Sequence, residues 1–297
     1  MSSTRRAVVL GGNGMVWRQR ILPYGMIPFL DLFAIANEFP YIWMVAMSFK
    51  PDGEIHSGSI FPTQPTLEQY GRLLFGYRFQ DLVLHLPFVD YFKNTVLITA
   101  ISLVLVLFTD ALAAYAFAKF EFRGKRVLFW VMIGTMLLPI YATLVPSFWL
   151  FSKLNLINTY QALILPGVVD AYGIFLLRQY MQSIPNELLD AAKIDGAGAF
   201  RRFWRIVVPL SRPALGTLAV FRFLFVWNDY LWPLVVVRDD SMYTLSLGIA
   251  NMEARQGMVI WGSQMAASVL ATIPVLLLVL LMQRQFLRGL TAGAFKA

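Results

Sequence analysis

The stretch that decides the fold is ELLDAAKIDG at residues 187–196, followed after a spacer by IVVP at residues 206–209. This stretch is polar and helix-prone, and a long apolar run lies on each side of it. Apolar runs of about 20 residues cross a bilayer core as helices. We therefore expect the loop at residues 185–209 to stand in water beside a membrane, with a short helix available for docking.

The composition is that of an integral membrane protein. Hydrophobic residues make up 58% of the 297 residues, charged residues only 14%, and the mean hydropathy is +0.61. Soluble domains carry fewer apolar and more charged residues. The absence of cysteine excludes a disulfide framework and a thiolate metal site. The net charge of +8 comes from basic residues scattered through short loops, so we expect no nucleic-acid partner.

Six stretches are long and apolar enough to cross a bilayer as helices. They lie at residues 21–47, 92–117, 127–150, 161–177, 213–236 and 260–283. The first carries several prolines together with Asp31 and Glu38, so we expect it to be kinked or to begin at the interface. The sequence predicts an all-α membrane protein with six transmembrane helices, and neither an internal repeat nor an inverted pair of broken helices is apparent.

Positive charge predicts the orientation, because cytoplasmic loops retain Lys and Arg. With the N-terminus inside, the inside segments hold most of the 25 basic residues. We therefore expect both termini and the 185–209 loop to be cytoplasmic. The predicted organisation is a cytoplasmic N-terminus (1–20), a first span with an external segment (21–91), a membrane core (92–283) and a cytoplasmic tail (284–297).

The loop itself divides into two helical segments. Asn186 and Glu187 favour a helix start, and Gly196 and Gly198 favour a stop about three turns later. In the second segment, one helical face is formed by Phe200, Phe203, Trp204 and Val207, opposite Arg201, Arg202 and Arg205. We expect this second segment to lie against lipid headgroups or the ends of the spans. An ordinary amphipathic loop is the alternative.

The spacing of the loop resembles the EAA signature, EAA-x3-G-x9-I-x-L-P, of permease subunits of ATP-driven (ABC) importers. The matching residues are Ala191, Ala192, Gly196, Ile206 and Pro209, with Asp190 in place of the glutamate and Val208 in place of the leucine. Further stretches are similar to the maltose-type carbohydrate permease family, in that family's order: Phe39–Trp43, Ser48–Pro51, Asn94–Thr95, Ala113–Ala118, Leu156–Thr159, Ile174–Gln179, Trp227–Leu231 and Gly289–Lys296. The chain looks like the six-span member of the family's pair of permeases.

The resemblance implies a type I ABC importer permease fold in a bacterial or archaeal cytoplasmic membrane. It implies that a second permease subunit completes the pore, that two ATP-binding subunits dock beneath it, and that a periplasmic or lipoprotein sugar-binding protein delivers the sugar. The residues implied to couple the chain to the ATPase are Glu187, Asp190, Ala191, Ala192, Gly196, Ile206 and Pro209. ATP and Mg would be used by the partners. This chain lacks a G-x-x-x-x-G-K-[ST] run, so we expect a non-catalytic subunit that binds no cofactor.

Polar residues at membrane depth form the second set of candidates, because they usually face protein or a water-filled cavity. The possible substrate or pore residues are Trp227, Asn228, Asp229, Tyr230, Asp110 and Asp170. The first four match a family motif and either contact a sugar or brace the external end of the fifth span. The two remaining carboxylates pair with Arg222, line the pore, or tie helices together.

Two other classes of function are open at this point. An ion-coupled secondary sugar carrier would use Asp110, Asp170 and Asp229 to bind protons or sodium. A membrane-embedded enzyme would need clustered His or carboxylates, and the sequence shows none. The residues do not choose among mono-, di- and oligosaccharides or sugar phosphates.

Overall fold

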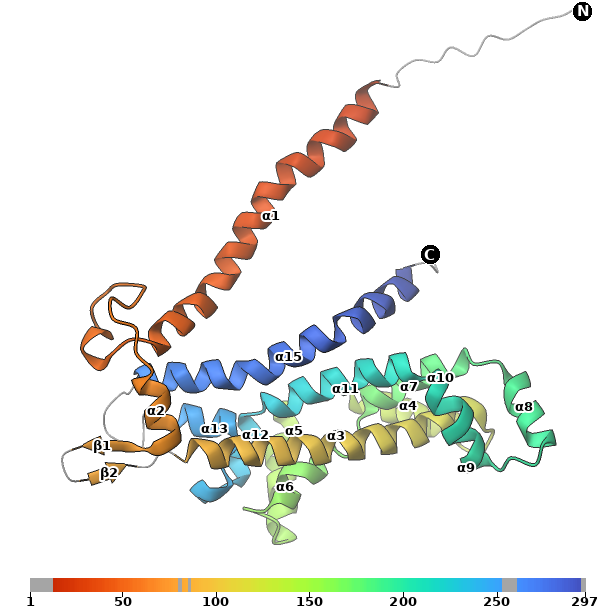
Figure 1. The fold of residues 1–297 in the computed structure, drawn as a ribbon. Coiled ribbons are helices and arrows are strands. Elements are labelled where there is room, and N and C mark those ends of the chain that lie inside the picture. The colour runs from red at the N-terminus through yellow and green to blue at the C-terminus, as the bar shows by residue number, and fades with distance from the viewer. Residues whose placement is uncertain (1–12, 80–81, 85–86, 253–260, 295–297) are drawn as a thin grey trace, which may run out of the picture.

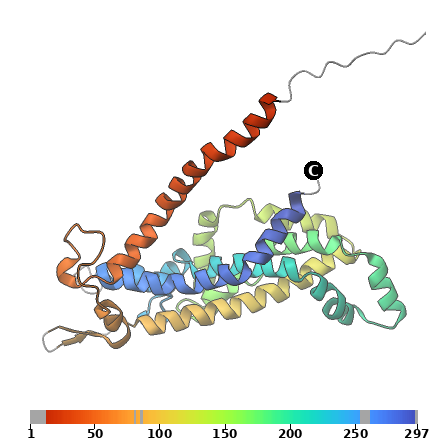
Figure 2. The ribbon, with the colours of Figure 1, turned by 45° about the horizontal axis from the view of Figure 1, so that its top comes forward.

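The computed structural model describes residues 13–79, 82–84, 87–252 and 261–294. Within this part the chain is helical apart from one short hairpin. Its helices form an elongated bundle from which the first helix, α1 (Asn13–Ser48), diverges in both views (Figures 1 and 2). Three helices are long and apolar enough to cross a membrane, and up to six spans result if each bent helix pair counts as one.

The centre of the bundle is α3 (Phe88–Lys119), which packs most extensively against α7 (Ala171–Gln182) and α11 (Arg212–Trp227). Side chains of these three helices form a buried cluster with Ala114, Leu177 and Leu218 at its heart. The last helix, α15 (Trp261–Ala294), covers α11 and meets α1 near the end of the bundle that carries the external segment.

Three of the six predicted spans are broken, which the apolar pattern of the sequence does not predict. The third consists of α4 (Lys125–Thr135) and α5 (Ile140–Lys153), which meet at 102°. The fourth consists of α6 (Tyr160–Ile164), η2 (Leu165–Gly167) and α7, with a bend of 41°. The fifth consists of α11 and α12 (Leu231–Val236), separated by residues 228–230. Pro139 explains the first break, because proline cannot donate the backbone bond that would continue the helix.

The first and last predicted spans are longer than expected. Helix α1 runs without interruption through Pro28 and Pro40, so neither proline ends the helix, and the expectation that it is kinked or begins at the interface stays a prediction. Helix α15 continues through residues 284–294, which the sequence assigns to a separate tail. The rest of that predicted tail (295–297), and residues 1–12 of the predicted N-terminal segment, lie outside the described residues.

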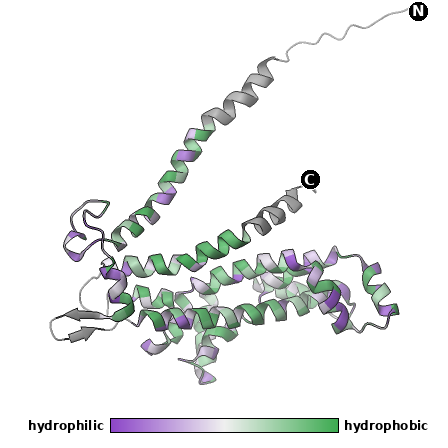
Figure 3. Cartoon of the chain, viewed as in Figure 1, coloured by the Kyte–Doolittle hydropathy of each residue, from purple (hydrophilic) through white to green (hydrophobic). Residues whose placement is uncertain are grey.

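The segment between α1 and α3, which the sequence predicts to be external, folds over one end of the bundle. It contains η1 (Asp52–Glu54), α2 (Glu68–Phe75) and a hairpin of β1 (Tyr77–Phe79) and β2 (Leu82–Leu84), paired antiparallel with Arg78 opposite Val83. The loop after α12 holds η4 (Asp240–Met242) and α13 (Leu245–Ala250). Hydrophilic residues gather in the 49–66 loop at one end and around α8 and α9 at the other, with green, apolar helices between them (Figure 3).

Buried polar side chains hold this external end together. Asn94 of α3 donates to the carbonyls of Ser241 and Tyr243 at 2.8 and 3.0 Å, and the Thr95 hydroxyl accepts from the Leu245 amide at 2.7 Å. The loop that follows α12 is therefore fixed to the start of α3 rather than left as a free connection.

Candidate functional site

The short helix predicted in the 185–209 loop is α8 (Asn186–Ile194), and it lies at the far end of the bundle from the external segment (Figure 1). Gly196 ends it at φ +78°, a left-handed conformation that favours glycine. The Ala197 amide donates to the Ala192 carbonyl at 2.8 Å and the Gly196 amide to Lys193 at 3.1 Å. These two bonds form a Schellman motif, which satisfies carbonyls that the helix end leaves free.

Helix α8 is attached to the end of α3. The Lys119 ammonium donates to the Ile184 carbonyl at 2.5 Å and to the Asn186 side chain at 2.8 Å. Leu189 is buried in the cluster of α3, α7 and α11, next to Tyr115. Hydrogen bonds and a packed side chain therefore hold α8 in a fixed position on the bundle. Lys119 is distant in sequence, and no pattern in the loop itself points to it.

The outer face of α8 is open. Glu187, Asp190 and Ala191 are exposed, as predicted for residues that meet a partner. Two apolar side chains that the signature does not include are also exposed: Leu188 at 47% and Ile194 at 88%. Their spacing along the helix places them beside Ala191, so α8 presents a small apolar surface flanked by carboxylates.

The second half of the loop packs back on the bundle. It comprises α9 (Ala199–Arg202), the π-helical turn η3 (Phe203–Val207) and α10 (Val208–Leu210). Of the predicted face, Phe203 and Val207 are buried, whereas Phe200 and Trp204 are exposed. The Trp204 ring stacks on Phe108 of α3 at 6.3 Å between centroids. This arrangement supports the prediction that the segment lies against the ends of the spans.

The π-helical turn has a cause in the sequence. Pro209 follows it and has no backbone N–H, so the α-helical bond to the Arg205 carbonyl is missing. Ile206 and Pro209, both assigned to coupling, are half-buried, as is Ala192. Their half-buried positions help to fix the path of the loop, and their role in coupling stays a prediction.

A second group of candidates lies at the break between α6 and α7. Asp110 of α3 is fully buried, and its Oδ1 accepts from the Asp170 amide at 3.0 Å. The Asp170 side chain in turn accepts from the Tyr172 amide at 3.1 Å and begins α7. The Thr109 hydroxyl donates to the Val168 carbonyl at 2.5 Å. These bonds supply partners for backbone groups that the helix break releases at membrane depth.

Asp110 therefore ties helices together, one of the three roles open for it. Among the described residues no ion pair joins Arg222 to Asp110 or Asp170. The Arg222 guanidinium lies across Gly167, where the lack of a side chain makes room for it. In the same way Asp110 lies against Gly173 of α7.

Asp170, Arg222 and Asp229 line a hollow of about 320 Å³ between α5, α6, α11 and α12. Thr143 and Ser147 of α5 also line it. Asp170 and Asp229 are both pore candidates from the sequence, and pairing with Arg222 is one of the three roles left open for Asp170; all three side chains line this hollow. Because the hollow offers donors and acceptors together, it suits a ligand rich in hydroxyl groups.

The other three pore candidates, Trp227, Asn228 and Tyr230, do not line this hollow. Trp227 is 4% exposed, its ring stacks on Phe223 at 5.2 Å, and its Nε1 donates to the Ala271 carbonyl at 3.1 Å. This ring is not open to a sugar, which corrects the expectation of a sugar contact there. The Asn228 side chain donates back to the Leu224 carbonyl, and Asp229 accepts from the Trp232 amide at 3.4 Å. Asn228 thus braces the end of α11 and Asp229 supports the start of α12, while Tyr230 is exposed.

Comparison with known proteins identifies the family. Residues 110–291, which include both candidate regions, match the model of the "binding-protein-dependent transport system inner membrane component" family. The chain belongs to this family. It is thus an inner-membrane permease component of a binding-protein-dependent transporter, and the family is one of transport subunits.

Curated relatives of this permease extend over most of its length. It is 35% identical to an arabinooligosaccharide transport permease of Halalkalibacterium halodurans over 87% of this chain and 91% of that protein. It is also 35% identical to a trehalose/maltose transport permease of Thermococcus litoralis, over 89% and 94% of the two chains. A glycerol-3-phosphate transport permease of Yersinia pestis is 44% identical over 60% of this chain and 64% of that protein.

Solved structures confirm the fold. A bacterial ABC transporter for the import of the acidic polysaccharide alginate matches with a TM-score of 0.79 at 24% identity, over 90% of this chain and 97% of the other. The same kind of transporter in complex with an alginate-pentasaccharide-bound periplasmic protein matches with a TM-score of 0.62 at 18% identity, over 91% and 96%. The predicted ABC importer permease fold is confirmed.

Proposed function

We propose that this permease forms one half of a heterodimeric pore in an ATP-driven importer of sugars or sugar derivatives, and that α8 couples the pore to the ATPase. The observation that carries the proposal is the attachment of α8 to α3 through Lys119. Because α8 is held to the longest helix of the core, a push on its open face moves both helices together. Leu188, Ala191 and Ile194 supply the apolar contact, and Glu187 and Asp190 supply charge for basic groups of the partner.

The proposed assembly contains a second permease, two ATP-binding subunits that use ATP and Mg, and a sugar-binding protein outside the membrane. Family membership supports these partners, since the family is defined by binding-protein-dependent transport. One structural neighbour is described in complex with a periplasmic protein that carries an oligosaccharide.

The proposed cargo is a carbohydrate, as the names of the relatives suggest for those proteins. The hollow lined by Asp170, Arg222 and Asp229 supports this class, because sugar hydroxyls both donate and accept hydrogen bonds. The hollow holds two carboxylates, Asp170 and Asp229, and one guanidinium, that of Arg222. This excess of negative charge favours a neutral sugar, because an anionic sugar would be repelled by the carboxylates in a poorly solvated site.

The coupling role is tested by placing a charge on the open face of α8. Ile194→Asp in the assembled transporter is expected to abolish ATP-driven uptake into proteoliposomes and to reduce copurification of the ATPase, with membrane insertion intact. Leu154→Asp is the matched control, because Leu154 is also exposed but follows α5, on the predicted external side.

Uptake that survives Ile194→Asp unchanged would contradict the coupling role. Uptake by this chain alone, driven by an ion gradient, would instead support the ion-coupled carrier. In that case Asp170 and Asp229 would be the carboxylates to substitute next.

A further inference from the structure

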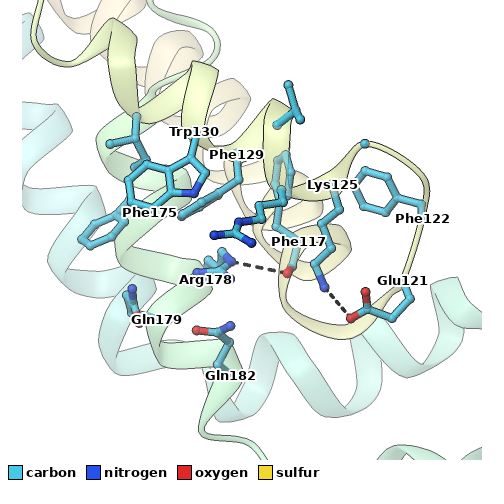
Figure 4. Close-up of a pocket in the computed structure, with 14 residues that line it drawn as sticks. Phe117, Glu121, Phe122, Lys125, Phe129, Trp130, Phe175, Arg178, Gln179 and Gln182 are labelled. Atoms are coloured by element: carbon cyan, nitrogen blue, oxygen red, sulfur yellow. Dashed lines mark hydrogen bonds and ion pairs between the residues drawn. The ribbon is translucent and has the colours of Figure 1, made fainter.

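A second hollow, of about 920 Å³, opens on the α8 side of the bundle between the end of α3, the start of α4 and α7 (Figure 4). Three basic side chains line it, Lys125, Arg126 and Arg178, against a single carboxylate, Glu121. Neither the signature loop nor the polar hollow at the α6–α7 break includes these residues. The excess of positive charge marks the hollow as a site for an anion.

The cations are held in place by the surrounding chain. Arg178 lies over the Phe129 ring, 4.1 Å from its centroid, and its Nε donates to the Phe117 carbonyl at 3.4 Å. Lys125 donates to the Phe120 carbonyl and to Glu121, both at 2.8 Å. Figure 4 marks the contact of Arg178 with Phe117 and that of Lys125 with Glu121. Arg178 is thus oriented through its Nε, and its terminal nitrogens make no hydrogen bond or ion pair with the residues that the structure describes.

The other walls are aromatic. Phe129, Trp130 and Phe175 stand together on one side of the hollow in Figure 4. From there the apolar surface continues along α4, where Val127, Trp130 and Val131 are 67, 62 and 62% exposed. A free inorganic anion would make no favourable contact with this apolar surface. A ligand with a charged head and apolar chains matches both parts.

The position of the hollow along the bundle agrees with a ligand that has a charged head and apolar chains. Lys119 and Gln182, which flank the start of α8, lie at this end of the bundle, so the hollow stands where spans meet the cytoplasmic surface under the predicted orientation. Tryptophan is enriched at this depth. Basic pockets between transmembrane helices on the cytoplasmic side bind the head groups of anionic lipids.

We propose that this hollow binds one anionic phospholipid, with its phosphate at Arg126 and Arg178 and its acyl chains along the exposed face of α4. The occupant is a lipid of the surrounding leaflet, selected by its negative head group. Bound there, it would join the α3–α4 connection to α7 next to the base of α8.

The test uses the assembled transporter, purified in detergent and titrated with phosphatidylglycerol or with phosphatidylcholine of the same chains, read by native mass spectrometry. Phosphatidylglycerol is expected to bind with higher affinity. Arg126→Gln is expected to weaken it about fivefold and Arg126→Gln with Arg178→Gln roughly 30-fold, since each basic residue near an anionic surface contributes about 1 kcal/mol. Arg126 is exposed and makes no hydrogen bond or ion pair within the described part of the chain, so the single variant keeps the fold.

The matched control is Arg123→Gln, which removes the same charge from the same connection at a residue that does not line the hollow. It is expected to leave phosphatidylglycerol binding within twofold of the wild type. Equal binding of the two lipids, or equal losses in the Arg123 and Arg126 variants, would overturn the proposal. Displacement of the lipid by millimolar inorganic phosphate would also overturn it, because the site would then be one for a free anion.

Discussion

Gly196 shows how one residue sets the shape of the coupling helix. Its φ of +78° is left-handed, and a methyl group there would meet no neighbouring atom, so the constraint is the backbone conformation and not space. Gly196→Ala is expected to cost about 1–2 kcal/mol and to loosen the end of α8. Faster amide exchange in α8 and lower transport-coupled ATPase activity would show this.

The neighbouring glycine provides the control for that experiment. Gly198 has φ −62° and ψ 166°, which any residue adopts, and a methyl group there also meets nothing. Gly198→Ala is expected to leave α8 exchange unchanged. An equal effect of the two substitutions would mean that a close partner contact, and not the left-handed turn, requires small residues here.

Asp52 gives a pH-dependent prediction at the external end. The hydrogen bond from Arg72, at 2.8 Å, lowers the pKa of the Asp52 carboxyl below 3.8, and a second bond from Gln69 adds to this. A carboxyl with a lowered pKa stabilises the fold fully above its ordinary pKa, and the contribution disappears as pH falls through the lowered value. Asp52→Asn is therefore expected to lower the melting temperature at pH 7 and pH 5, with the difference shrinking below pH 3.8.

The melting temperature of the purified assembly, measured at pH 7, at pH 5 and below pH 3.8, checks this prediction. Asp90→Asn is the control. Asp90 pairs with Lys93 at 3.2 Å, but both side chains are more than half exposed, and such pairs contribute little. A pH-independent difference between Asp52→Asn and the wild type would contradict the assigned role of the ion pair.

At the scale of elements, the most extensive helix packing in the described part of the chain is that of α3 and α7. Gly173 of α7 leaves the space that the Asp110 carboxylate fills, and Leu218 of α11 approaches the same point. Close approach through small residues is the usual way for membrane helices to pack. Gly173→Ala is expected to force the helices apart and to destabilise the chain by about 1–3 kcal/mol.

Thermal unfolding of the purified assembly measures that effect. Gly134→Ala in α4 is the control, because a methyl group there meets nothing within van der Waals contact. It is expected to be neutral or slightly stabilising, since alanine favours a helix more than glycine does. If Gly173→Ala melts like Gly134→Ala, the packing of α7 on α3 is looser than described.

The sequence predicts where the membrane elements lie but not which of them break. Proline alone does not decide this: Pro28, Pro146 and Pro274 lie inside continuous helices, whereas Pro139 stands at a 102° bend. A missing backbone bond is tolerated where neighbouring groups replace it, and those neighbours come from distant parts of the chain.

The same limit applies to the candidate site. The spacing of Ala191, Ala192 and Gly196 lies within one short stretch, so it could be recognised from the sequence. The attachment of α8 through Lys119 could not, because it depends on a contact between residues that are 65 positions apart. The sequence left open whether Trp227 contacts a sugar or braces the span, because apolar residues precede it and the polar Asn228 and Asp229 follow it. One helical step turns its ring into the core against Phe223 while Asn228 faces outward.

At the scale of the whole molecule, α1 is the element with the least support from its own chain. Over Met26–Ser48 only 6% of its most apolar window is buried, and side chains such as Phe29, Leu32 and Ile35 are 65–67% exposed. Figures 1 and 2 show it leaving the bundle at an angle. Its contacts with α15 lie at one end, so most of its apolar surface is left for lipid or for the second permease.

We expect the second permease to cover part of α1, so that stable packing of this helix depends on the partner. Cysteine pairs between α1 and the second permease, placed in this cysteine-free chain at Phe29 or Ile35, are expected to crosslink in the assembled transporter. The comparison is a cysteine at Asn37, a polar position of α1 whose side chain donates a hydrogen bond to the Phe33 carbonyl. Efficient crosslinking of α1 only to α11 or α15 of its own chain would show instead that the helix folds back on its own bundle.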